Sequence, residues 1–138
     1  MIADMSEDEL RLNYENRYRD FTNDISPLTL MKKLTRVPSE KSYWALELSK
    51  AERQLRSLEI KKKRLIRDLS NMLNEKSPIT LHKGTINRIE ESDNVEELTT
   101  LIDDVKMTIK QLERIYDCVK FVAKDFENIL KFIQLQDG

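Results

Sequence analysis

Two long stretches of this chain place apolar residues at steps that alternate between four and three. The first stretch runs from Trp44 to Met72, and Lys62 is the one charged residue in its pattern. The second runs from Leu98 to Ile133 and contains no charged residue in its pattern. Such heptad spacing is typical of helices that pack against each other along one side. It predicts two long helices as the main elements of the fold.

The composition agrees with a helical protein. Charged residues make up 36% of the 138 residues, above the usual quarter, and the chain has only 2 Gly and 3 Pro. The hydrophobic fraction of 39% is enough for one modest core. We therefore predict a single all-α domain, built as a long antiparallel helical hairpin or coiled coil.

The ends of the helices are marked by capping and breaking residues. Ser6 and Glu9 have the spacing of a capping box, and the first helix is expected to end near Thr22. Ser26 followed by Pro27 predicts the start of a second helix of one or two turns, which Pro38 interrupts.

Residues 74–92 break the heptad pattern and contain β-prone pieces around a turn at Lys83-Gly84, which predicts a small β-hairpin-like insert. The predicted segments are short N-terminal helices over 1–38, a first long helix over 39–73, this insert over 74–92, and a second long helix over 93–138.

The second long helix carries more apolar surface than one neighbour can cover. A second stripe of Leu101, Ile115, Val122 and Ile129 runs beside its heptad stripe. Uncovered stripes of this size usually mark an interface, so we expect self-association. The alternative is that the N-terminal segments fold back over the stripe. The residues expected at the interface between copies are Val122, Phe126, Ile129, Leu130 and Ile133.

Positive charge gathers on the first long helix although the chain has 24 basic and 25 acidic residues. On a helical wheel of about 100° per residue, the basic residues lie opposite the heptad stripe or at the border of that face. Only Glu52 and Glu59 are acidic between positions 50 and 67. We call this set the basic ridge: Lys50, Arg53, Arg56, Lys61, Lys63, Arg64 and Arg67.

A ridge of one charge sign is suited to a polyanion, and above all to a nucleic-acid backbone. Lys and Arg neutralise phosphates and release counterions, and Arg also stacks on unpaired bases. Two alternatives stay open. The ridge can be an ordinary solvated face, or it can pair with the acidic block at 90–97 or with the acidic N-terminus.

No arrangement of residues indicates catalysis, a metal or a cofactor. The chain has no Gly-rich phosphate loop, no paired cysteines and no acid–His–nucleophile set, so an enzyme is not expected. His82 is expected at an exposed turn, Trp44 in helix packing rather than on a base, and Cys118 as a small hydrophobe. A single cysteine and the lack of a secretory or membrane-spanning stretch favour a reducing, intracellular location.

The order of these features resembles the UvsY family of recombination mediators from T-even-type phages. The likeness covers the layout of most of residues 24–138. Its parts are DI at 24–25, RVP at 36–38, Tyr43-Trp44, KKKRLIR at 61–67, TI at 85–86, and above all the ending NILKFIQLQDG at 128–138.

The chain also departs from the family pattern in several places. Met72 to Asn74 stand where the family has aromatic residues and a glycine, and Phe132 stands where it usually has tryptophan. Arg67 matches one of the two basic DNA-contacting positions of the family, whereas Leu69 stands at the other.

The resemblance implies a ring-like homo-oligomer assembled through C-terminal helices in the cytoplasm of an infected host. Such a protein binds single-stranded DNA, loosens its single-strand-binding protein and loads a RecA-like recombinase. Two other functions stay open: a coiled-coil adaptor or assembly chaperone that binds no DNA, and a regulatory partner whose acidic helix at 6–21 mimics nucleic acid.

Overall fold

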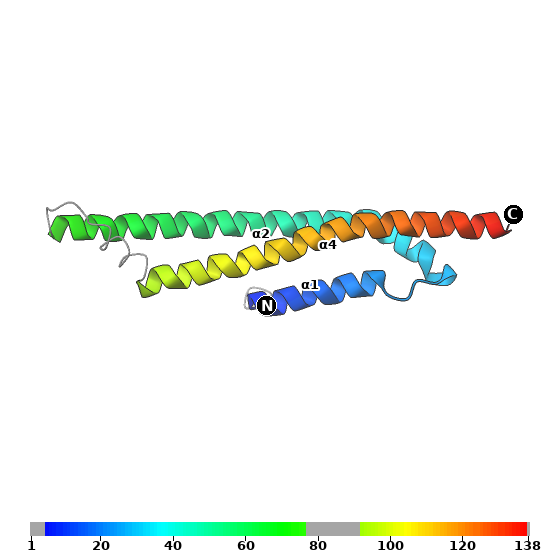
Figure 1. Cartoon of the computed structure of the whole chain (residues 1–138), viewed down its shortest axis with the longest axis horizontal. Coiled ribbons are helices and arrows are strands. Elements are labelled where there is room, and N and C mark those ends of the chain that lie inside the picture. The colour runs from blue at the N-terminus through cyan, green and yellow to red at the C-terminus, as the bar shows by residue number, and fades with distance from the viewer. Residues whose placement is uncertain (1–4, 77–91, 138) are drawn as a thin grey trace. The chain divides into compact units, whose positions relative to one another are not determined.

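The computed structural model of the chain describes residues 5–76 and 92–137. These residues form three helices: α1 (Glu7–Thr22), α2 (Pro27–Lys76) and α4 (Asp93–Asp137), shown in Figure 1. The described ranges contain no strand, so the predicted all-α class is confirmed. Residues 74–76, predicted as part of the insert, are the end of α2, and the rest of the β-hairpin prediction, over 77–91, lies outside the described residues.

Contacts along the chain divide it into two compact units. The first contains Met1–Lys50 and Thr108–Gly138, and the second contains Ala51–Met107. Both α2 and α4 contribute residues to each unit. The first unit also contains α1.

The start of α1 and the connection to α2 follow the capping signals. The backbone N–H of Glu9 donates to Ser6 Oγ over 3.2 Å, as the capping box predicts. After α1, Asp24 takes a left-handed backbone conformation with φ of 52°. The backbone N–H of Thr29 then donates to Ser26 Oγ over 3.3 Å, so Ser26 and Pro27 begin α2 as expected.

The prediction that Pro38 interrupts the helix is wrong. α2 continues through Pro38 for 50 residues, so the short second helix and the long helix from residue 39 are one element. Pro38 has no N–H for the carbonyl of Leu34, and Figure 1 shows α2 changing direction in this blue-to-cyan part. Pro38 is itself exposed, while Val37 and Glu40 beside it are buried. Packing on both sides of the proline therefore holds the helix together.

Aromatic pairs join the helices in the core of the first unit. Tyr14 of α1 meets Trp44 of α2 edge to face, with ring centroids 5.6 Å apart. Phe21 meets Phe126 of α4 in the same way at 5.8 Å. Trp44, Phe21 and Phe126 are all buried, and burial of large aromatic side chains dominates core energetics. These contacts hold α1 against both longer helices.

A buried carboxylate reinforces the α1–α2 contact. Glu40, only 1% exposed, accepts hydrogen bonds from Arg17 over 3.1 Å, Arg36 over 3.0 Å and the indole N–H of Trp44 over 3.1 Å. Because three donors satisfy it, Glu40 can be buried in its charged form.

Tyr14 makes the stability of the folded protein depend on pH in the alkaline range. Burial, together with the hydrogen bond that its hydroxyl donates to Glu47 over 2.9 Å, raises the pKa of Tyr14 above the usual value near 10. A raised pKa in the folded state stabilises the protein below pH ~10, and this contribution is lost as the pH rises beyond it.

We therefore expect the free energy of unfolding to fall between pH ~10 and ~11, and to fall less steeply in Tyr14→Phe, by up to ~1.4 kcal/mol per pH unit. Denaturant unfolding of both proteins across this pH range measures the two slopes. Equal slopes would contradict the assignment.

In the second unit, most predicted heptad residues of α2 and α4 are buried or half-buried, whereas Met72 at the end of the first stripe is exposed. Ala51, Ile102 and Val105 are buried, and Leu58 and Leu65 are half-buried. The basic side of α2 is thereby left on the surface. Within the described residues, none of the three helices has the length and hydrophobicity of a membrane-spanning segment.

Candidate nucleic-acid interface

The basic ridge lies on the exposed side of α2. Its members are exposed, whereas the heptad residues Leu55, Leu58, Leu65 and Leu69 on the other side of the helix are half-buried. Lys50 belongs to the first unit and the remaining members to the second. The predicted sorting of cations and apolar residues to opposite sides of α2 is therefore confirmed for the second unit.

Most of the ridge has no carboxylate partner. Lys50 pairs with Glu47 over 3.2 Å, and Arg67 Nε lies 3.9 Å from the carboxylate of Asp68. The other five members form no ion pair with any described residue: Arg53, Arg56, Lys61, Lys63 and Arg64. Asp68 was not considered in the sequence analysis because only acidic residues between positions 50 and 67 were compared with the ridge.

The acidic segments do not neutralise the ridge among the residues that the structure describes. At the N-terminus, Glu7 accepts a hydrogen bond from Thr108 over 2.7 Å and Asp8 pairs with Arg11. Glu96 and Glu97 of the acidic block are exposed on α4, and no ion pair links either to the ridge. Residues 90 and 91 of that block lie outside the described ranges.

An exposed isoleucine lies within the ridge. Ile60 is 49% exposed and stands seven residues after Arg53 and four before Arg64, so it shares their side of the helix. Sequence reasoning missed it because it treated the ridge only as a set of charges. The exposed side of α2 therefore carries an apolar side chain among its cations.

Three residues singled out in the sequence have different outcomes. Trp44 is buried and donates to Glu40, which confirms its packing role. Cys118 is half-buried. The pKa of the nearby Tyr18 hydroxyl is raised, first because Tyr18 is partly buried and second because it interacts with the Cys118 thiol. His82 lies outside the described residues.

The residues predicted for an interface between copies differ in how exposed they are. Phe126 is buried inside the chain against Phe21, so α1 covers this part of α4, as the alternative reading allowed. Ile115 of the second stripe is also fully buried. Ile129 is exposed, while Val122, Leu130 and Ile133 are half-buried.

Three other apolar side chains of α4 are more exposed than the predicted ones. Phe121, Phe132 and Leu135 are exposed by 72%, 61% and 80%. Their spacings of 11 and three residues place them within an arc of about 60° at 100° per residue. That spacing was available in the sequence but lies outside both predicted stripes. We call these residues, with Ile129, the α4 apolar face.

No protein-family model matches this sequence, and searches of curated proteins and of solved structures return no match. Among the described residues, no group of three or more His, Cys, Asp or Glu side chains is placed to hold a metal ion.

Proposed function

We propose that the chain is a recombination mediator that binds single-stranded DNA along the basic ridge. The observation that carries the proposal is the group of five exposed cations of α2 that have no carboxylate partner among the described residues. Unpaired cations on one helix face attract a phosphate backbone, and their binding releases condensed counterions.

The length and chemistry of the ridge favour an unpaired strand. From Arg53 to Arg64 the helix rises roughly 17 Å, which is several nucleotides of backbone. Three of the five unpaired members are arginines, whose planar guanidinium groups stack on exposed bases. Ile60 adds an apolar contact at the same face.

The further parts of the proposal concern assembly and partners. We infer that copies of the chain, each with an antiparallel α2–α4 coiled coil, associate through the α4 apolar face into a ring. Repeating the ridge around a ring raises the effective affinity for one long strand. Such an assembly would displace single-strand-binding protein and hand the strand to a RecA-like recombinase, as the resemblance to the UvsY family implies.

Binding to single-stranded DNA is expected to weaken steeply with salt. If the five unpaired cations each contact one phosphate, the slope of log K against log salt is about −3.5 per protomer, since single strands give about −0.7 per contact. The affinity should then fall about 100-fold between 50 and 200 mM salt. Fluorescence anisotropy with a labelled oligonucleotide at several salt concentrations measures the slope.

The absence of binding at low salt would overturn the proposal. In that case the α4 apolar face would instead favour an adaptor or assembly chaperone that recognises protein. A slope near zero with tight binding would show that the ridge cations are not the contacts.

A further inference from the structure

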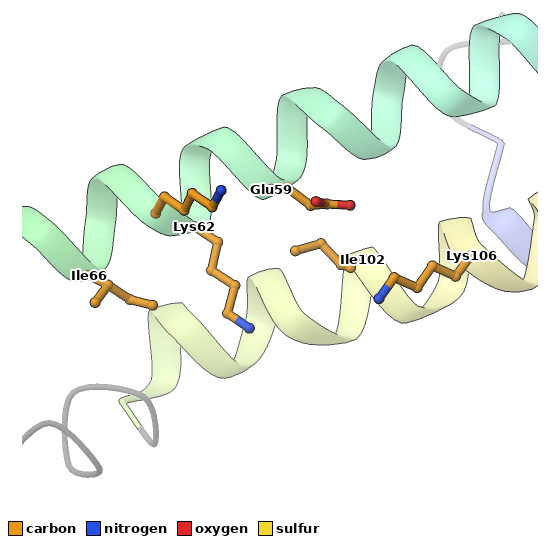
Figure 2. Close-up of a pocket in the computed structure, with 6 residues that line it drawn as sticks. Glu59, Lys62, Ile66, Ile102 and Lys106 are labelled. Atoms are coloured by element: carbon orange, nitrogen blue, oxygen red, sulfur yellow. The ribbon is translucent and has the colours of Figure 1, made fainter. Parts of the chain in front are cut away.

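A groove lies between α2 and α4 inside the second unit, beside the basic ridge. Its volume is about 300 Å³, at the lower end of small-ligand sites, and it is lined by Glu59, Lys62, Lys63, Ile66, Ile102 and Lys106. Figure 2 shows Glu59, Lys62 and Ile66 on α2 and Ile102 and Lys106 on α4, with Ile102 pointing toward α2 and Lys106 lying along α4.

The groove explains the charged residue in the first heptad stripe. Lys62 occupies a position where the pattern calls for an apolar residue, and its side chain is half-buried. A charged residue at such a position lowers the stability of helix packing, so it calls for a specific reason. Lys62 and Ile102 both line the groove, and a lysine there can bury its apolar stem while its ammonium group stays at the surface.

The charges of the groove favour an anion. Three lysines line it against one carboxylate, that of Glu59, and none of Lys62, Lys63 and Lys106 forms an ion pair with a described residue. Like charges gathered in a partly enclosed site repel each other, and a bound anion relieves that repulsion. Ile66 and Ile102 add two apolar side chains to this lining.

We propose that this groove is a phosphate-binding site. An ammonium group binds phosphate as a point charge, and three of them around one groove suit an anion that carries more than one negative charge. Lys63 belongs both to the groove and to the basic ridge. The phosphate can therefore belong to a nucleic-acid backbone that lies on the ridge, or to a free phosphate compound. The first of these two sources rests on the proposed function.

The test uses the full chain with ¹³C-labelled isoleucine methyl groups. Ile66 and Ile102 line the groove, whereas Ile60 lies on the ridge and outside it. Pyrophosphate is titrated in at constant ionic strength, with sodium chloride as the balancing salt. We expect saturable shifts of the Ile66 and Ile102 signals that exceed the shift of Ile60.

Lys106→Met should reduce the apparent affinity for pyrophosphate at least tenfold, and Lys110→Met, which changes an exposed lysine one turn further along α4, should not. The circular-dichroism spectrum and melting temperature confirm that each variant is folded. The proposal is overturned if pyrophosphate moves neither groove methyl more than chloride does, or if Lys106→Met binds as tightly as the parent.

A second titration with a single-stranded oligonucleotide identifies the source of the phosphate. If the oligonucleotide competes with pyrophosphate for the groove signals, the site takes a backbone phosphate. If pyrophosphate binds but the oligonucleotide leaves those signals unchanged, the site takes a free phosphate compound. This second result leaves the groove in place even if the chain fails to bind DNA, so the two proposals fail separately.

Discussion

Reversing the charge of Arg53 and Arg64 together is expected to weaken binding to single-stranded DNA by about 100-fold at low salt. Both side chains are exposed and neither has a carboxylate partner among the described residues, so the change removes two phosphate contacts and adds repulsion. The slope of log K against log salt should become shallower by about 1.4, the share of two contacts on a single strand. Anisotropy titrations of the Arg53→Glu, Arg64→Glu variant measure both quantities.

The matched control is Lys110→Glu with Lys124→Glu, which makes the same change of net charge at exposed positions of α4. Its affinity should stay within a few-fold of the parent because neither lysine belongs to the basic ridge. If both double variants lose affinity equally, the attraction is a property of the net charge and the ridge is not the site. Exposed substitutions of this kind usually change stability by less than ~0.5 kcal/mol, so both variants should remain folded.

Two phenylalanine-to-alanine changes on α4 are expected to affect different properties: one the stability of the fold, the other self-association. Phe126 is 1% exposed and packs against Phe21, so Phe126→Ala should lower the free energy of unfolding by about 3–5 kcal/mol. Phe132 is 61% exposed, so Phe132→Ala should leave the fold of a single copy intact while weakening self-association. Chemical unfolding and light scattering measure the two effects.

Repeating both measurements at several protein concentrations separates core from interface. Any loss of stability in Phe132→Ala should depend on concentration, because association stabilises a folded copy by mass action. The loss in Phe126→Ala should be present at every concentration. An unchanged mass in Phe132→Ala at all concentrations would contradict an interface on the α4 apolar face.

Local sequence signals predicted the helix ends well where the capping effect of a residue does not compete with tertiary packing. The Ser6 cap, the start of α2 at Pro27 and the start of α4 at Asp93 appear where the sequence placed them. The heptad spacing also identified the packed side of each long helix. Pro38 was different because its local cost of about 3 kcal/mol competes with tertiary packing. Val37 and Glu40 beside Pro38 are buried, and that burial is not visible in local sequence.

The sequence predicted which side of α2 carries the exposed cations, but not which of those cations pair with a carboxylate. The wheel located the exposed cations of α2, yet pairing of Lys50 with Glu47 and the contact of Arg67 with Asp68 required coordinates. On α4, the sequence showed an excess of apolar surface without showing which part α1 covers. Phe21 and Phe126 are far apart in sequence, and no periodicity within one helix reports a contact with another.

The contacts between α1 and α4 also set an order of events during synthesis of the chain. Gln111 donates to the backbone carbonyl of Arg11 over 2.8 Å, 100 positions away, and Arg114 pairs with Glu15, 99 positions away. Because a ribosome makes the N-terminus first, α1 must wait for most of the polypeptide before its second neighbour exists. Until then Phe21 lacks its aromatic partner on α4, and a nascent chain would present it to chaperones or to other nascent copies.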